Sequence, residues 1–199
     1  MSGIIAENSG RHTGLVKASS GGAGVWNLIL TQTASASATI SFTSGIDSTY
    51  DKYVFKFYNI HPATDGATLN FQANAAGGSG YNETMTTTYF LTYHDEGDST
   101  PALGYEASLD QAQATRFQRL AKSGNGNDEC SSGELCLFNP SSTVFVTHYF
   151  SRTQNLYTAN SEDDYSAGYF NTTSAIDEIQ FKMSSGNIDA GQISLFGIS

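Results

Sequence analysis

Residues 176–198 decide the fold class, and they read IDEIQFKMSSGNIDAGQISLFGI. Apolar and polar side chains alternate over 176–183 and again over 192–198. A period of two places alternate side chains on one face of a strand, so each half predicts a half-buried β-strand. Gly186-Asn187 and Asp189-Ala190-Gly191 supply turn residues between them. We therefore expect these two strands to form the last strand pair of an all-β protein.

The same pattern recurs along the chain. The strongest further strand is 53–60, in which alternation places Tyr53, Phe55, Phe57 and Asn59 on one face. The apolar run Val25–Leu30 could be a strand buried on both faces. The remaining strands are predicted at 36–42, 68–72, 89–94, 135–139, 143–150 and 168–171.

About ten strands with short connections predict a two-sheet sandwich, of jelly-roll type, in a single domain over residues 25–199. The strand order does not follow from this pattern. Residues 106–122 differ, because Leu109, Ala112, Phe117 and Leu120 recur at roughly helical spacing. They predict one short helix or a long ordered loop.

Residues 1–24 differ from the rest, because they combine many Gly and Ser residues with two short apolar patches. We interpret them as an extended N-terminal arm that cannot bury much surface alone and that docks on a neighbouring chain. The candidate assembly residues of this arm are Ile4, Ile5, Leu15 and Val16.

Composition excludes several classes of partner. The 199 residues include 9 Lys and Arg against 19 Asp and Glu, a net charge of −10, and the basic residues never cluster. Nucleic acid and anionic membranes both require a basic surface, so neither is an expected partner. No apolar stretch reaches the length of a transmembrane helix, and the first residues lack the pattern of a secretory signal. Only 14% of the residues are charged, which suits closely packed assemblies.

No catalytic, cofactor or metal site is predicted. The four histidines do not pair at metal-ligand or catalytic-triad spacing. The acids of 95–96, 128–129 and 162–164 are interpreted as solvated loop residues, with glycosidic hydrolysis as a weaker alternative. A second weaker alternative is calcium binding, by Asn125, Asn127 and Asp128 or by residues 162–164. Cys130 and Cys136 could span a short hairpin as a disulfide, or remain two thiols near a loop.

Tyrosines that could stack on sugar rings form a further set of candidates, although strand aromatics more often lie in cores or interfaces. They are Tyr81, Tyr89, Tyr93, Tyr105, Tyr157 and Tyr165.

Two stretches resemble structural proteins of tailed bacteriophages. The first is 45–62, GIDSTYDKYVFKFYNIHP, and the second is 169–177, YFNTTSAID, continuing to 183–191, MSSGNIDAG. The resemblance covers most of residues 25–198 and implies a virion component on a β-sandwich, without enzyme activity. It extends to proteins of capsid decoration and of tail appendages, so the place in the particle stays open.

We therefore expect a non-enzymatic virion protein, made in the cytoplasm of a bacterial host. Our first hypothesis is a capsid decoration or cement protein that binds the major capsid protein or other virion proteins and is itself a homo-oligomer, with a trimer favoured. Its binding energy would come from buried apolar area and strand addition. The alternative is a tail or fibre protein that binds a host glycan. A glycan-degrading enzyme is a weaker third hypothesis.

Overall fold

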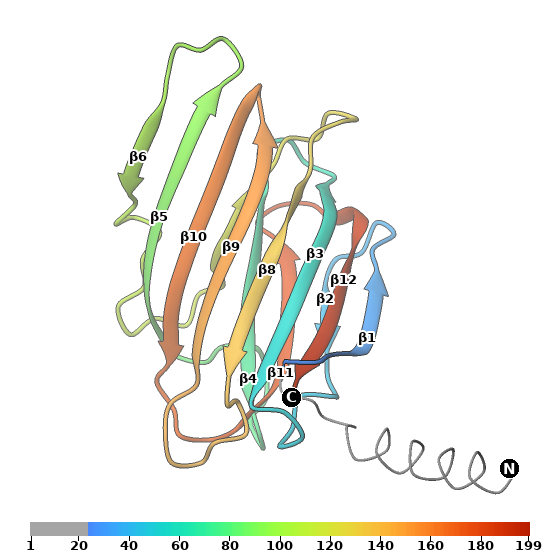
Figure 1. The fold of residues 1–199 in the computed structure, drawn as a ribbon, viewed down its shortest axis with the longest axis vertical. Helices are drawn as coiled ribbons and strands as arrows, with labels where there is room; N and C mark the ends of the chain where they lie inside the picture. Colours follow the sequence, from blue (N-terminus) through green and yellow to red (C-terminus); the bar gives the residue numbers. More distant parts are fainter. Residues whose placement is uncertain (1–23) are drawn as a thin grey trace, which may run out of the picture.

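The computed structural model describes residues 24–199, which form twelve β-strands and, within that range, no helix (Figure 1). Neighbouring strands are antiparallel, and they form one sheet of eight strands and one of four. The predicted all-β two-sheet sandwich is confirmed. The strands are β1 (Trp26–Thr33), β2 (Ile40–Phe42), β3 (Lys52–Pro62), β4 (Thr68–Ala75), β5 (Met85–Asp95), β6 (Ala102–Tyr105), β7 (Gln118–Lys122), β8 (Ser131–Phe138), β9 (His148–Tyr157), β10 (Asn160–Phe170), β11 (Ile176–Met183) and β12 (Ile188–Ile198).

Eight of these strands have the connectivity of a jelly roll. They pair in a nested series, β1 with β12, β2 with β11, β3 with β8 and β4 with β7. A long antiparallel ribbon that wraps into a sandwich gives this nesting, and the pairs fall alternately in the large and the small sheet. The predicted jelly-roll type is confirmed.

The other four strands are insertions that widen the large sheet. Strands β5 and β6 lie between β4 and β7 in the chain, and β9 and β10 lie between β8 and β11. All four add to the edge of β8, which gives the sheet order β1-β12-β3-β8-β9-β10-β5-β6. Figure 1 shows this broad sheet in front, with β4 and β11 of the small sheet behind it.

An aromatic cluster joins the two sheets. The ring of Phe181, on β11 of the small sheet, lies 5.3 and 5.4 Å from the rings of Phe55 and Phe57 on β3 of the large sheet. It also lies 6.2 Å from Phe42 and 6.5 Å from Phe71, its neighbours in the small sheet. All five side chains are buried. The alternation that predicted the strands therefore directs these rings into one core.

The predicted pairing of the last two strands is wrong. Strand β11 pairs with β2 and β4 in the small sheet, whereas β12 pairs with β1 and β3 in the large sheet. Residues 184–187 carry the chain between the sheets, and 189–191 belong to a bulged part of β12. Gly191 has φ 112°, and a Cβ there would lie 2.6 Å from the carbonyl oxygen of Asn59. The glycine thus allows close strand approach and not a hairpin turn.

The predicted helix within 106–122 is also wrong. Residues 106–117 form turns and bends, and β7 follows them. Their polar side chains bond to neighbouring elements, because Gln118 Oε1 accepts hydrogen bonds from Thr87 at 2.9 Å and from Gln111 at 3.1 Å. Gln111 and Gln118 are both buried. Tertiary partners therefore override a weak helical spacing.

Three strand predictions need correction. Of the predicted strand at 36–42 only Ile40–Phe42 is a strand, because Ala36 has φ 48° and leaves the extended conformation. The predicted strand at 143–150 begins only at His148, and Val144 and Phe145 before it are among the most exposed apolar residues. The run Val25–Leu30 is not buried on both faces, because β1 is an edge strand with partly exposed side chains. The predicted arm residues Ile4, Ile5, Leu15 and Val16 lie outside the described residues.

Candidate functional site

The outer face of the large sheet, which points away from the small sheet, carries a row of apolar side chains. Their neighbours along the strands, such as Phe55, Leu135 and Leu195, point into the core. The cross-strand register aligns one residue from each of six adjacent strands. From β1 to β10, the row consists of Leu28, Phe196, Val54, Cys136, Phe150 and Ala167.

Two aromatic contacts widen this row. Trp26 packs edge to face on Phe196, with ring centroids 5.6 Å apart, and Phe138 lies 5.6 Å from Phe150. We call Trp26, Leu28, Phe138, Phe150 and Phe196 the outer patch. The exposed fractions of the first four are 47%, 60%, 37% and 40%, so they present apolar surface to their surroundings.

Cations lie on the rings of the outer patch. The Nζ atom of Lys52 is 5.6 Å from the ring of Phe138 and 5.9 Å from that of Phe150. The Nζ atom of Lys56 is 4.6 Å from the ring of Trp26. Such contacts are modest at exposed sites and strengthen when water is removed. Val54 and Cys136 are buried between Trp26, Leu28 and Phe196 on one side and Phe138 and Phe150 on the other. Exposed aromatic rings with adjacent cations are typical of a protein interaction site.

Both cysteines are free thiols. Cys130 precedes β8 and Cys136 lies within it, so an extended chain places their Cα atoms about 20 Å apart. A disulfide needs a Cα separation of about 4.4–6.8 Å, which this strand cannot provide. Cys136 is buried, and burial raises the pKa of its thiol to about 11.

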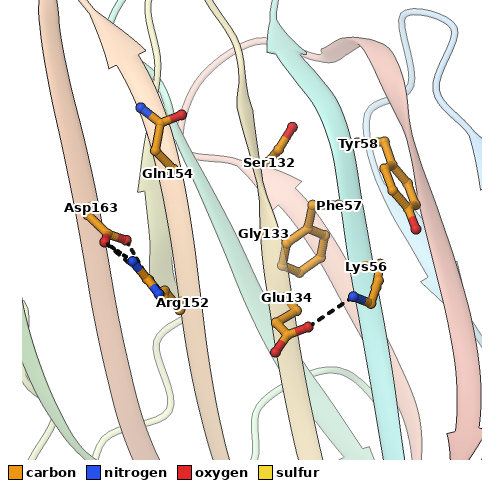
Figure 2. Close-up of a pocket in the computed structure, with 9 residues that line it drawn as sticks. All are labelled: Lys56, Phe57, Tyr58, Ser132, Gly133, Glu134, Arg152, Gln154 and Asp163. Atoms are coloured by element: carbon orange, nitrogen blue, oxygen red, sulfur yellow. Dashed lines mark hydrogen bonds and ion pairs between the residues drawn. The ribbon is translucent and has the colours of Figure 1, made fainter.

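Beside the outer patch, the same face carries a polar groove of about 450 Å³ that crosses β3, β8, β9 and β10 (Figure 2). Tyr58 stands on one side of it, and Gln154 and Asp163 stand on the other. The groove residues are Lys56, Phe57, Tyr58, Ser132, Gly133, Glu134, Arg152, Gln154 and Asp163.

Two ion pairs order the charged side chains of the groove. Lys56 Nζ lies 3.3 Å from Glu134 Oε2 across the β3–β8 pair. Arg152 donates to Asp163 from Nη2 at 2.7 Å and from Nε at 3.1 Å. A fork of this kind fixes the plane of both groups and leaves lone pairs free for a ligand. The arrangement can bind a polar ligand, and such pairs are also common on solvated sheet faces.

A second charged cluster lies between the sheets, on the inner face of the inserted strands. Asp164 of β10 is fully buried and accepts hydrogen bonds from Tyr89 Oη at 2.5 Å and from Asn155 Nδ2 at 2.8 Å. Arg119 of β7 donates to Asp164 at 3.3 Å and also to Glu162. The guanidinium thus bridges two carboxylates that belong to one strand.

The electrostatics of this cluster are dominated by burial. Burial raises the pKa of Asp164 above the ordinary range, Arg119 opposes that shift, and Glu162 adds to it. Burial and the charge of Asp164 also raise the pKa of Tyr89. The cluster is closed by protein groups on most sides, so a structural ion-pair network explains it without a substrate.

The structure revises our interpretation of the loop acids. Glu162, Asp163 and Asp164 are strand residues, not solvated loop acids, and their side chains alternate between inward and outward ion pairs. Asp95 accepts hydrogen bonds from the backbone of Ser99 and Thr100, and Glu129 accepts them from Gly126 and Thr158. These two acids hold turns in place. Within residues 24–199, no three His, Cys, Asp or Glu side chains gather in a way that could hold a metal ion.

The candidate tyrosines are scattered. Tyr89 is buried, so its interpretation as an exposed stacking residue is wrong. Tyr165 stacks on Phe90, with ring centroids 4.6 Å apart, and Tyr105 is exposed on the edge strand β6. Tyr58, which lines the groove, lies in the predicted strand 53–60 but is not among the six candidate tyrosines. Its place beside charged groups depends on three other strands, so local sequence gave no signal for it.

Comparison with known proteins leaves the family open. No protein-family model matches the chain, and no curated protein is significantly similar to it. Among the described residues, no helix has the length and apolar character needed to cross a membrane.

Proposed function

We propose that the protein is a non-enzymatic structural component of a tailed bacteriophage virion, and that it decorates or cements the capsid. The observation that carries this proposal is the outer patch. Residues 45–62 and 169–191 resemble structural proteins of tailed bacteriophages, and this resemblance is the reason for proposing a phage particle.

The outer patch supports an assembly role because its exposed side chains are apolar and lie on adjacent strands of one sheet face. If this face of the sheet only contacted solvent, its side chains would be polar. Trp and Phe anchors on such a surface usually contribute most of the energy of a protein interface. The partners under this proposal are the major capsid protein or another virion protein, and further copies of this chain, with a trimer favoured.

The test is to locate the chain in purified particles. We expect cryo-electron density for the jelly roll on the head lattice, in a copy number that is a multiple of the local symmetry. Density confined to the tail, or absence from the particle, would refute the decoration role. A second experiment uses Phe150→Ser, which should leave the sandwich folded and reduce incorporation of the protein into particles.

A second candidate function is binding of a host glycan, as in a tail or fibre protein. The groove of Figure 2 favours it, because Tyr58 lines one side of it and the side chains of Arg152, Gln154 and Asp163 line the other. An aromatic ring beside planar hydrogen-bonding groups suits a sugar with vicinal hydroxyls.

A glycan array followed by NMR titration tests this candidate. Tyr58→Ala should weaken any binding that occurs in the groove, whereas Tyr105→Ala, on the distant edge strand β6, is the matched control. Equal effects of the two variants, or binding to no glycan, would exclude the groove as a sugar site.

A further inference from the structure

The edge strand β1 shows a conflict between its sequence and its surroundings. Its run Val25–Leu30 has the apolar character of a strand covered on both faces, yet Val25, Trp26, Leu28 and Leu30 are all exposed in the described structure. One backbone edge of β1 also has no partner strand within residues 24–199. Local and global signals disagree in this way mainly where a functional contact is made.

The position of the chain start links this surface to the N-terminal segment. The backbone N–H of Gly24 donates to the carbonyl of Ser199, next to Trp26 of the outer patch. Residues 1–23 therefore join the sandwich at the margin of the patch. They contain the dipeptides Ile4-Ile5 and Leu15-Val16.

Charge also favours contact between this segment and the sandwich. Residues 1–23 contain two basic residues and one acidic residue, a net charge of +1. The remaining seven basic and eighteen acidic residues give 24–199 a net charge of −11. Opposite net charges speed the encounter of two surfaces and do not oppose their contact.

The length of the segment allows contact with another copy. Leu15 precedes Gly24 by nine residues, which is about 30 Å of extended chain. The six strands of the apolar row span about 24 Å at a strand spacing of about 4.8 Å. The segment is therefore long enough to reach the patch of a neighbouring copy.

We propose that residues 1–23 of one copy pack on the outer patch of a neighbouring copy, with Leu15-Val16 against Trp26, Leu28 and Phe196. This inference rests on the assembly role proposed above and names the surface and the occupant. Each neighbour receives one segment and donates its own, so the contact is head to tail and closes into a ring if the rotation allows it.

Trp26 is the only tryptophan of the chain, and its place in the patch makes it a reporter. In the full chain, we expect its emission to shift to the blue and its acrylamide quenching to fall as protein concentration rises, in step with sedimentation. Leu15→Ser/Val16→Ser should weaken self-association by about 10- to 100-fold, because burial of one such side chain is worth about one to two powers of ten. Ser19→Ala/Ser20→Ala is the matched control in the same segment.

A double-mutant cycle locates the contact. Leu28→Ser alone should weaken association, and its combination with Leu15→Ser/Val16→Ser should cost much less than the sum, because both changes remove the same contact. Additive losses would overturn the proposal. The proposal would also be overturned if the Trp26 signal were the same in the wild type and in Leu15→Ser/Val16→Ser, because another surface would then cover the patch.

Protection of Trp26 that depends on the arm but not on concentration would place the segment on its own sandwich, and would overturn the contact between copies. These outcomes are separate from the virion test. If the chain is found on the capsid but its Trp26 signal is unchanged by Leu15→Ser/Val16→Ser, this inference is wrong and the decoration role is still supported.

Discussion

The packing of the two sheets can be tested at Phe181. This ring is fully buried and touches aromatic rings of both sheets, so Phe181→Ala removes one of the central contacts between them. Truncation of a buried Phe to Ala costs about 3–5 kcal/mol through lost burial and the cavity that remains. The edge-to-face pairs with Phe42, Phe55 and Phe57 place the expected loss near the upper end, at about 4–5 kcal/mol.

That loss is large compared with the total stability of a domain, which is about 5–15 kcal/mol. For a domain of this size, each kcal/mol lowers Tm by about 2–4 °C, so we expect a decrease of about 8–20 °C. Urea unfolding followed by far-UV circular dichroism gives the free energy of unfolding directly. The slope against urea should stay unchanged if only the native core is altered.

The matched control is Phe150→Ala, at a ring of the same size that is 40% exposed on the outer face of the large sheet. We expect it to cost less than about 1 kcal/mol in the isolated protein. A loss below about 1.5 kcal/mol for Phe181→Ala, or equal losses for the two variants, would contradict the sandwich core described above.

Three further predictions concern buried ionisable groups. Because burial raises the pKa of Asp164 in the folded state, its carboxyl favours folding below the unfolded pKa and loses that contribution as pH rises through the folded pKa. Relative to Asp164→Asn, the free energy of unfolding of the wild type should thus fall by up to about 1.4 kcal/mol per pH unit between about pH 4 and the folded pKa. Urea unfolding measures this, and the same pH dependence in both proteins would refute it. Arg119→Met leaves Asp164 and Glu162 without their shared cation, so we expect a loss of about 3–5 kcal/mol at pH 7.5, and no change would show that the bridge is weak. At pH 8, Ellman's reagent should not react with Cys136 in the folded protein, because its thiol is buried with a pKa raised to about 11, and labelling of Cys130→Ser before urea is added would contradict that packing.

The alternation of apolar and polar residues could predict the strands, but not the β-bulges at which the alternation shifts by one residue. On β3 it correctly places Tyr53, Phe55 and Phe57 in the core. It fails at Asn59, which has φ 51° and forms a bulge, so the next residue, Ile60, is the buried one. Asn tolerates this backbone conformation better than most residues, which is the one local signal for the slip.

The polar strands could not be predicted, because their partners lie far away in the chain. Residues 160–167 of β10 contain three acids and no aliphatic run, so they resemble a loop. Their burial makes sense only once Arg119, 45 residues before Asp164, packs opposite them. Pairwise chemistry of this kind is invisible to local pattern, and so is the groove beside Tyr58, which four strands build together.

The inserted strands connect the polar cluster to the outer patch. Strands β9, β10, β5 and β6 extend the large sheet beyond β8, and the short strand β7 packs on the inner face of β9 and β10. Met85, Tyr149 and Phe170 of the inserted strands extend the apolar core beside Phe71, and Arg119 and the turns of 106–117 add polar groups to the same inner face. On the outer face, the same extension adds Phe150 to a row that would otherwise end at Cys136 on β8. The insertion therefore enlarges the core between the sheets and widens the outer face at the same time.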